Sequence, residues 1–353
     1  MDTIKQNNVH GICVSVLVVV RNEEQYIEQC LVSILNQTFD PKRYEIIVVD
    51  GMSTDRTREI VERLINEHQD HQIRLLDNPQ KILAPGWNIG IRESKGQIII
   101  RIDGHGSIGR DFISKSVCVL REHPDAWVAG GYCKTVSSGY VGNVIAAAMS
   151  SPVGVGNAMF RLGNYEGYVD TIATGAYWRW VYDKIGMYDE ELVRTEDDDL
   201  NRRIICAGGK IWLSKSIMST YYSRSSLRKL WRQYFQYGFW RSRTIQKHRR
   251  PAVLRQVLPL LFVSSLVVLG LAGVFCKIAL WLLGIEVAIY ALGLLYGALD
   301  VGRKAGWKYA LLAPIVFAIL HFAYGLGSLW GIVRFVLLEG RFMPKPSDFK
   351  PSN

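Results

Sequence analysis

Two hydrophobic patterns divide the chain. Up to Ala207, short apolar runs alternate with stretches in which apolar residues recur at helical spacing. The run 14–20 is almost continuously β-branched, which is typical of a buried parallel strand. We expect strands at 14–20, 45–50, 73–76, 97–103 and 127–132, and helices at 26–35, 56–67, 87–94, 114–122, 181–185 and 197–207. Alternating strands and helices predict an α/β, Rossmann-like fold with a mostly parallel sheet covered on both faces.

The second pattern begins after Arg255, where charges almost disappear. No charged residue lies between Arg255 and Lys277, only Glu286 lies between Lys277 and Asp300, and 309–333 holds only His321. Each stretch reaches the roughly 20 residues that cross hydrocarbon. We therefore expect about three transmembrane helices in residues 256–337, the alternative being a buried helical hairpin. Glu286 and His321 should face other helices or a partner, because lipid contact would be costly, and pairing with each other is an open alternative.

Acidic residues mark the carboxyl ends of two predicted strands. Asp50 ends the second, and Asp103 ends the fourth and is followed by His105. In open α/β sheets, ligands bind beyond these strand ends, and both Asp103 and His105 can ligate a metal ion. A further acidic run, Thr195–Asp199, opens a predicted helix and can supply a general base. The pattern weakens between Tyr132 and Thr174, which we expect to form a long functional loop or subdomain.

The net charge of +10 is concentrated in one segment. Residues 221–255 carry ten Lys or Arg and no Asp or Glu. A basic block just before a transmembrane helix favours the cytoplasmic side and anionic lipid head groups; nucleic-acid binding is the less favoured alternative. Within it, 228–235 is amphipathic and should lie in the membrane interface or pack on the domain. Six scattered cysteines without metal spacing predict a reducing compartment, and we identify no signal peptide.

These motifs, in this order, resemble those of family 2 glycosyltransferases, which have the GT-A fold. The resemblance covers about residues 12 to 245 and is carried by 18–24 (VVVRNEE), 48–55 (VVDGMSTD), 78–90, 103–105 and 195–200. The segments 151–161 and 167–171 are similar to a narrower, membrane-bound group of the family that extends lipid-linked sugars.

The resemblance implies a catalytic and a metal site. Asp103 would hold Mg²⁺ or Mn²⁺ on the donor diphosphate. The family usually has a second Asp where this chain has His105, so the imidazole is either the second ligand or a solvent-exposed loop residue. Asp197 would be the base that deprotonates the acceptor hydroxyl, with Glu196 as the alternative. Asp198 could be solvated at the helix N-terminus.

The same resemblance implies contacts to both substrates. Nucleotide-sugar contacts are expected from Val20, Arg21, Asn22, Glu23, Asp50, Asn88 and Asp103. Acceptor contacts are expected from Gln236, Trp240 and Arg241, in a motif in which Phe239 replaces the usual Arg. Turn or capping roles remain the alternative for Asn22 and Asn88, and membrane anchoring remains the alternative for Trp240.

Together these features predict an inverting, metal-dependent glycosyltransferase of the inner (plasma) membrane. Its parts would be a cytoplasmic GT-A domain (1–220), a basic interface segment (221–255), multi-pass transmembrane helices (256–337) and a tail (338–353). The donor would be a nucleotide-sugar, UDP-linked by preference, and the acceptor a polyprenyl-diphosphate-linked saccharide. Membrane lipids are expected partners, nucleic acid is not, and oligomerisation stays open. The alternatives are a polyprenyl-phosphate glycosyl synthase, a processive polysaccharide synthase and an inactive membrane scaffold.

Overall fold

The computed structural model describes residues 12–163, 165–249 and 253–338. The chain forms two compact units: Met1–Lys134 with Gly163–Tyr221, and Thr135–Leu162 with Tyr222–Asn353. The predicted tail after 338, with its basic residues, lies outside the described residues.

The first unit is built on one mixed sheet. In the described part of the chain its strands run in the order β3-β2-β1-β4-β8-β6-β9-β5, and β7 pairs with β9. Strands β1 to β4 are mutually parallel, whereas β8, β5 and β7 pair antiparallel with their neighbours. The bounds are β1 Val14–Val20, β2 Tyr44–Asp50, β3 Gln72–Asp77, β4 Ile98–Asp103, β5 Gly106–Ile108, β6 Ala126–Val136, β7 Gly167–Val169, β8 Gly175–Trp178 and β9 Lys210–Tyr222.

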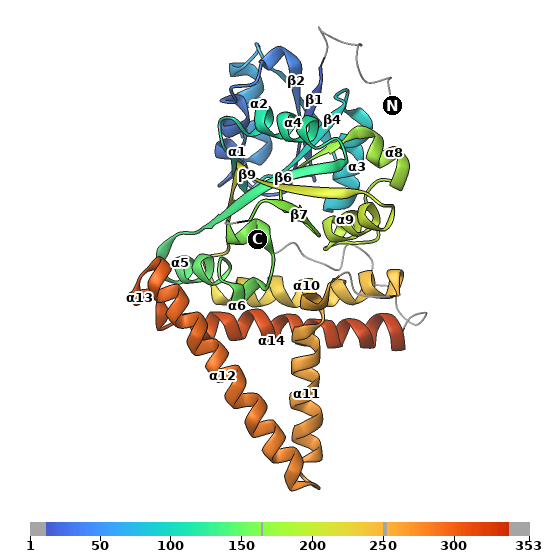
Figure 1. Cartoon of the computed structure of the whole chain (residues 1–353). Coiled ribbons are helices and arrows are strands. Elements are labelled where there is room, and N and C mark those ends of the chain that lie inside the picture. The colour runs from blue at the N-terminus through green and yellow to red at the C-terminus, as the bar shows by residue number, and fades with distance from the viewer. Residues whose placement is uncertain (1–11, 164, 250–252, 339–353) are drawn as a thin grey trace. The chain divides into compact units, whose positions relative to one another are not determined.

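Helices cover both faces of this sheet (Figure 1). One face of β1 (Val14, Val16, Val18) joins a core with α1 (Ile27–Leu35), α2 (Thr57–Glu67) and α4 (Phe112–Glu122). The other face packs on α3 (Leu83–Glu93), where a Cβ on Gly86 would lie 2.5 Å from Val19. The unit is completed by η1 (Pro41–Arg43), α8 (Arg179–Ile185) and α9 (Glu196–Cys206).

The predicted α/β class with a mostly parallel sheet is confirmed, and the five predicted strands are present. Four strands were not predicted. Strands β5, β7 and β8 have only three or four residues each, and β9 interrupts its apolar positions with serines and lysines because much of it is exposed. The sheet is therefore more mixed than the sequence pattern indicated.

The second unit is helical. Part of the weakly patterned segment 132–174 belongs to it as α5 (Gly139–Ala148), α6 (Pro152–Val155) and α7 (Met159–Leu162). The remaining elements are α10 Leu227–His248, η2 Leu254–Gln256, α11 Leu258–Ala272, α12 Lys277–Ala305, α13 Trp307–Ala310, α14 Ala313–Ile332 and the π-helical turn η3 Val333–Leu337.

Polar contacts tie the segment 151–157 to the C-terminal helices. Ser151 Oγ donates to Asp300 Oδ2 at 2.8 Å, and Arg255 Nη1 donates to Asn157 Oδ1 at 2.7 Å. The carbonyl of Val153 lies 2.9 Å from His321 Nε2. This motif is therefore a docking element within the second unit, not an irregular loop.

Helices α10 and α14 run parallel and in close contact (Figure 1). A Cβ on Gly327 would lie 2.1 Å from the Phe235 carbonyl oxygen, and one on Gly331 would lie 2.5 Å from that of Phe239. Farther along, Gln246 Nε2 donates to the Phe335 carbonyl at 2.8 Å. Glycine on α14 thus lets the two backbones approach, as small residues do in membrane helix pairs.

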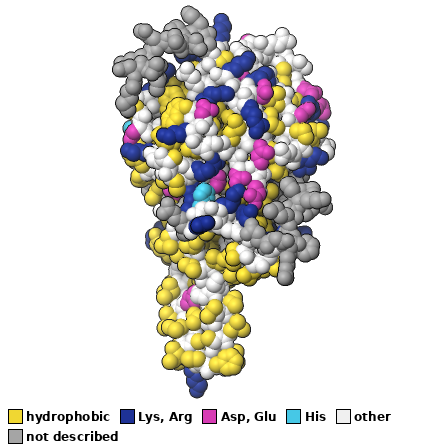
Figure 2. All heavy atoms as spheres, turned by 90° about the vertical axis from the view of Figure 1, so that its right-hand side faces the viewer, with side chains coloured by type: hydrophobic (Ala, Val, Ile, Leu, Met, Phe, Trp, Pro, Cys, Tyr) yellow, Lys and Arg dark blue, Asp and Glu magenta, His cyan; other side chains and the backbone are white. Residues whose placement is uncertain are grey.

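Two helices in the described part of the chain are long and apolar enough to cross a membrane: Lys277–Ala305, and Ala313–Leu337, which joins α14 and η3. Helix α11 has 15 residues, fewer than the roughly 20 that a span needs. Figure 2 shows hydrophobic side chains over the visible face of the α11–α12 hairpin. Length and composition thus support two of the three predicted spans.

The two polar groups predicted inside this region do not pair with each other. Glu286 accepts a hydrogen bond from Ser265 Oγ. His321 lies 3.1 Å from the Tyr290 hydroxyl through Nδ1 and contacts Val153 through Nε2. Each group therefore has a partner on a neighbouring helix, which reduces the cost of placing it in apolar surroundings, although Glu286 Oε2 has no hydrogen-bond partner among the described residues.

Candidate active site

The candidate site lies at the carboxyl ends of the parallel strands. Val20 pairs with Asp50 across β1 and β2, and Val19 pairs with Asp103 across β1 and β4. The register therefore brings Asp50 and Asp103 to the same edge of the sheet, on either side of the loop that begins at Arg21. This is where open α/β sheets bind ligands.

Arg101 stands at the centre of the site and was not predicted. Its Nη2 lies 3.7 Å from Asp103 Oδ1 and 3.7 Å from Asp197 Oδ2. Its guanidinium carbon lies 4.9 Å from the ring centroid of Trp87 and 5.7 Å from that of Tyr188. The side chain is 6% exposed. A buried cation therefore joins two carboxylates from distant parts of the sequence, held by aromatic rings on which an arginine stacks favourably.

The hydrogen bonding of Arg101 is incomplete. Among the residues that the structure describes, its Nε and Nη1 have no hydrogen-bond partner. Most buried polar groups in proteins are hydrogen-bonded, so these nitrogens need an explanation, of which a role in binding or catalysis is one. The sequence contained one indication that Arg101 belongs to the site. It is a lone arginine inside the apolar strand 98–102, two residues before Asp103, and therefore on the same face of the strand.

The four acids of the Thr195–Asp199 run have different environments. Asp199 is buried and pairs with Arg203 at 2.8 Å. Asp198 accepts from Thr171 Oγ1 at 3.4 Å. Glu196 is 3% exposed, whereas the Asp197 side chain is 33% exposed. Asp197 therefore combines solvent access with the contact to Arg101, which favours it over Glu196 as the group that meets an acceptor.

Burial changes the proton affinity of Glu196 and Asp197. It raises the pKa of Glu196 to about 8, and the neighbouring Asp197 charge adds to the rise. The surrounding protein also raises the pKa of Asp197 by removing water, Asp198 adds to this, and the Arg101 charge opposes it. A carboxylate with a raised pKa is a stronger base once it is ionised, so the shift at Asp197 suits proton abstraction, while the Arg101 charge favours its ionised form.

The backbone at the start of α9 is in a left-handed conformation. Thr195 has φ = +66° and ψ = 18°, which is uncommon for a β-branched residue. Such strain costs on the order of 1–3 kcal/mol and gathers at functional sites. Here it turns the chain so that Glu196 and Asp197 begin the helix, whose N-terminal dipole favours negative charge.

The predicted metal residues lie close together but do not form a complete ligand set. Among the described residues, no three His, Cys, Asp or Glu side chains gather so that they could hold a metal by themselves. His105 Nδ1 lies 3.2 Å from Glu23 Oε1, and metal-bound histidines are typically oriented by such a carboxylate. The donor set thus fits a cation only if substrate oxygens complete its coordination.

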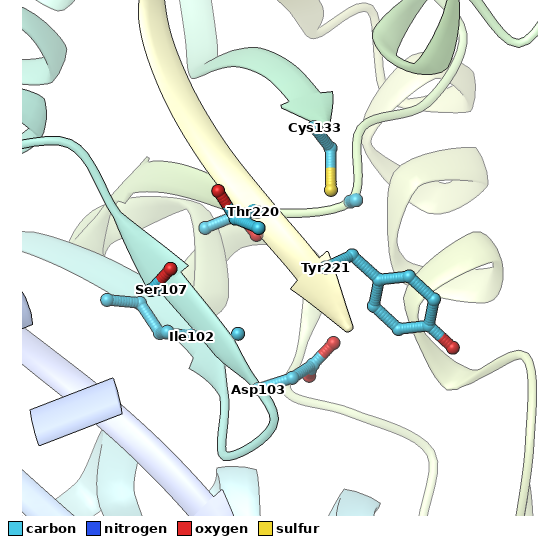
Figure 3. Close-up of a pocket in the computed structure, with 9 residues that line it drawn as sticks. Ile102, Asp103, Ser107, Cys133, Thr220 and Tyr221 are labelled. Atoms are coloured by element: carbon cyan, nitrogen blue, oxygen red, sulfur yellow. The ribbon is translucent and has the colours of Figure 1, made fainter. Parts of the chain in front are cut away.

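A small pocket of about 20 Å³ borders Asp103 (Figure 3). It lies between the ends of β4, β6 and β9, with Asp103, Cys133, Thr220 and Tyr221 around it. The ring of Tyr221 also contacts His105, with centroids 5.3 Å apart. The pocket has room for about one water molecule and is too small for a sugar ring.

Several residues predicted to contact the nucleotide-sugar hold neighbouring loops. Asp50 accepts from Ser53 N at 3.1 Å and Ser53 Oγ at 2.5 Å, and lies 3.6 Å from Arg58. Asn22 has φ = +55° and accepts from Thr54 N at 2.8 Å. The Val20 carbonyl accepts from Gly51 N at 2.8 Å. These bonds shape the loop after β2 beside the site, and contact with a donor stays a prediction.

Arg21 and Asn88 are also engaged within the unit. Arg21 Nη1 donates to the Lys81 carbonyl at 3.3 Å. Asn88 Nδ2 donates to the Tyr188 carbonyl at 2.9 Å and to Glu190 Oε1 at 2.8 Å, and Asn88 Oδ1 accepts from Tyr188 N at 2.9 Å. Asn88 therefore fixes the Tyr188 segment that packs on Arg101, a positioning role that its sequence context did not reveal.

Comparisons with known proteins identify the family. A family model described as Glycosyl transferase family 2 matches residues 15–149. The succinoglycan biosynthesis protein ExoA of Rhizobium meliloti (strain 1021) is 30% identical over 315 residues, which span 87% of this chain and 91% of that protein. The chain belongs to glycosyltransferase family 2. The resemblance inferred from the sequence motifs is thereby confirmed, and this glycosyltransferase is an enzyme by family.

Two further similarities extend over most of the glycosyltransferase. A dolichyl N-acetyl-alpha-D-glucosaminyl phosphate 3-beta-D-2,3-diacetamido-2,3-dideoxy-beta-D-glucuronosyltransferase of Methanococcus voltae is 23% identical over 91% of this chain and 97% of that protein. The mannosyltransferase PcManGT from Pyrobaculum calidifontis, solved with GDP-Man and Mn²⁺, has a TM-score of 0.58 at 17% identity, covering 91% and 88% of the two chains. The latter supports the GT-A-like fold.

The acceptor residues predicted for this glycosyltransferase lie in the second unit, on α10. Trp240 is 4% exposed and Arg241 is 7% exposed, and Arg241 Nε donates to the Tyr324 hydroxyl of α14 at 3.2 Å. Gln236 is only partly buried and lines an apolar groove. Of the three, Gln236 is the residue that the structure leaves open to a ligand; an acceptor role for the other two stays a prediction.

Proposed function

We propose that this glycosyltransferase transfers one sugar, with inversion, from a nucleotide-sugar to a saccharide carried on a polyprenyl diphosphate. The observation that carries the proposal is the position of Arg101, 3.7 Å from both Asp103 and Asp197. One buried cation links a carboxylate at the strand end, where a donor diphosphate would bind, to a carboxylate that can activate an acceptor.

The reaction follows from these positions. Asp197 takes the proton of the acceptor hydroxyl as its oxygen attacks the anomeric carbon. The bond from that carbon to the diphosphate oxygen breaks, and its electron pair leaves with the nucleoside diphosphate. Arg101 holds the Asp197 carboxylate, and its charge favours the ionised form that the base needs. Glu196, whose pKa of about 8 keeps it largely protonated at neutral pH, adds little negative charge beside it.

A divalent cation fits this site as a cofactor shared with the donor. Asp103 would hold it, with His105, oriented by Glu23, as the second candidate ligand. Bound Mg²⁺ or Mn²⁺ would neutralise charge on the departing diphosphate. The Mn²⁺ in the PcManGT complex supports such a cofactor in this fold.

The relatives support a lipid-linked saccharide as the acceptor, and the diphosphate link is our own proposal. One acts on a dolichyl-linked N-acetylglucosaminyl phosphate, and another serves succinoglycan biosynthesis. The apolar helices α12 and α14 suit an enzyme of the plasma membrane whose catalytic unit is cytoplasmic. We therefore infer that its product enters exopolysaccharide or glycan assembly. S. aureus TarS, which has a similar fold (TM-score 0.50, 18% identity), was solved with UDP-GlcNAc, and this supports UDP as the preferred donor nucleotide.

The test is a transfer assay with the purified full chain. It is incubated with membrane lipid extract, Mn²⁺ or Mg²⁺ and a panel of labelled UDP- and GDP-sugars, and labelled lipid is identified by mass spectrometry. One added sugar on a lipid-linked saccharide supports the proposal. Label on a lipid phosphate that carries no sugar would show a polyprenyl-phosphate glycosyl synthase, and long polymer would show a processive enzyme.

A further inference from the structure

A groove of about 540 Å³ lies along helix α10 in the second unit. Its apolar lining comes from Trp231, Phe235 and Phe239 of α10 and from Trp330 of α14. Trp231 is 39% exposed and Trp330 is 51% exposed. Its size falls within the range of roughly 300–1,000 Å³ typical of small-ligand sites, and such sites are mainly apolar and aromatic.

The polar lining of the groove is cationic. Arg232 of α10 and Arg334 of η3 both line it, together with Gln236. No Asp or Glu is among the described residues that line the groove. Arginine recognises phosphate through paired N–H donors. Because α10 and α14 run parallel, with Phe235 against Gly327 and Phe239 against Gly331, Arg232 lies at one end of the aromatic lining and Arg334 at the other. The groove therefore complements an unsaturated or apolar chain that carries a phosphate group at one end.

The two sides of the groove are held in register by the α10–α14 contact. Phe235 and Phe239, which line the groove, are also the residues whose carbonyls contact Gly327 and Gly331. Arg232 and Arg334 come from segments about 100 residues apart, so no local sequence motif reveals the pair. A backbone contact this close fixes the spacing of the aromatic and cationic groups.

We propose that this groove binds the phosphate end and the first isoprenoid units of the lipid that carries the acceptor. The inference rests on the proposed function, since it assigns the lipid part of that acceptor. An arginine at one end of the lining contacts the phosphate groups, and the aromatic side chains between Arg232 and Arg334 contact the branched, unsaturated chain. Gln236, the acceptor residue that the fold leaves accessible, lies in the same groove.

The experiment measures binding of farnesyl diphosphate to the full chain in detergent, through tryptophan fluorescence, and the KM values of the transfer reaction. The test variant combines Arg232→Gln and Arg334→Gln. The matched control combines Arg228→Gln and Lys229→Gln, two exposed bases of α10 that do not line the groove. Inorganic diphosphate and phosphatidylglycerol vesicles are the competing ligands.

We expect the test variant to weaken farnesyl diphosphate binding at least tenfold and to raise the KM for lipid acceptor, with the KM for nucleotide-sugar unchanged. The control should change either value less than twofold. Trp330→Ala should weaken the binding of farnesyl diphosphate but leave the binding of inorganic diphosphate unchanged.

Equal binding by the test variant and the wild type would overturn the site. So would displacement of farnesyl diphosphate by phosphatidylglycerol at similar concentration, which would indicate a general anionic-lipid surface. If lipid glycosylation occurs but the groove variants transfer normally, the groove assignment fails and the proposed function stands. If the groove binds the isoprenoid as expected and no lipid is glycosylated, the proposed function fails instead.

Discussion

Arg101 places one positive charge against two carboxylates while aromatic rings exclude water from it. Both Asp103 and Asp197 lie 3.7 Å from its Nη2. Because the protein around it is apolar, this charge acts on Asp197 more strongly than a solvated one would. Arg101 therefore tunes the base as well as positioning it.

This tuning predicts a change in the pH dependence of transfer. Asp197 works as a base when deprotonated, so kcat rises with pH through its pKa. The Arg101 charge lowers that pKa, so Arg101→Gln should move the rising limb to higher pH and reduce transfer at neutral pH by roughly one to two orders of magnitude. Arg101→Lys keeps the charge and should leave the limb nearly in place. A pH–rate profile of Arg101→Gln that matches the wild type would refute the tuning role.

Glu196 gives a prediction for stability. Its carboxyl titrates near 4.5 when unfolded and at about 8 when folded, so between these values the folded state holds a proton that the unfolded state lacks. Its contribution to stability is therefore present below about 4.5 and is lost as the pH rises to about 8. Glu196→Gln stays neutral, so it should be more stable than the wild type at pH 8.5, by up to a few kcal/mol, and about equal at pH 4.5. Thermal unfolding at both pH values checks this; a difference that does not depend on pH would contradict it.

The metal ligands are tested by two substitutions. Asp103→Ala should abolish the metal dependence of transfer and weaken nucleotide binding, because it removes the carboxylate at the end of β4, which is the predicted metal ligand. His105→Ala should change the preference between Mn²⁺ and Mg²⁺, since imidazole suits Mn²⁺ better. Activity is titrated with each metal. If His105→Ala leaves the dependence of activity on each metal unchanged, the His105–Glu23 pair stabilises the loop and does not bind the metal.

Among the secondary-structure elements, the α10–α14 pair depends on glycine. Gly327→Leu puts a side chain where a Cβ alone would lie 2.1 Å from the Phe235 carbonyl oxygen, so the helices must separate. We expect a loss of stability on the order of 2 kcal/mol and weaker farnesyl diphosphate binding. Gly293→Leu on α12 is the control, because no described atom lies within 4 Å of a Cβ there. Equal melting temperatures for the two variants in detergent would contradict the close contact.

The strands and helices also show which parts of the fold could be predicted from the sequence. Strands such as Val14–Val20 were predicted because a fully buried parallel strand needs a continuous apolar run. Strand β9 was missed because an antiparallel, partly exposed strand mixes serine and lysine with its buried Ile211, Leu213 and Ile217. The acids Asp103 and Asp197 were found because each sits in a local motif.

Other parts of the site depend on contacts between distant segments. The surroundings of Arg101 come from Trp87 of α3 and Tyr188 after α8, which only the fold brings together. The burial of Trp240 and Arg241 depends in the same way on α14 packing against α10. A local motif cannot show that such a side chain is covered.

For the molecule as a whole, membrane topology can be tested at the α11–α12 hairpin. Helix α11 alone is shorter than a span, but the uncharged stretch 256–276 that contains it has 21 residues. If the hairpin crosses the bilayer and the catalytic unit is cytoplasmic, Cys276 between the two helices lies outside, whereas the exposed Cys118 and Cys206 of the first unit lie inside. A membrane-impermeant maleimide applied to intact cells should therefore label Cys276 alone, with Cys276→Ser as the control. Labelling of Cys276 only after permeabilisation would show that the hairpin does not cross.

The decisive measurement is transfer of labelled sugar to membrane lipid by the wild type, Asp197→Asn and Asp198→Asn, with nucleotide-sugar binding measured in parallel. Asp197→Asn keeps the size of the side chain and removes the base, so transfer should fall by roughly two or more orders of magnitude while donor binding persists. Asp198→Asn should retain most activity. Near-normal transfer to lipid by Asp197→Asn, or no lipid product from the wild type with any donor, would contradict the proposed chemistry.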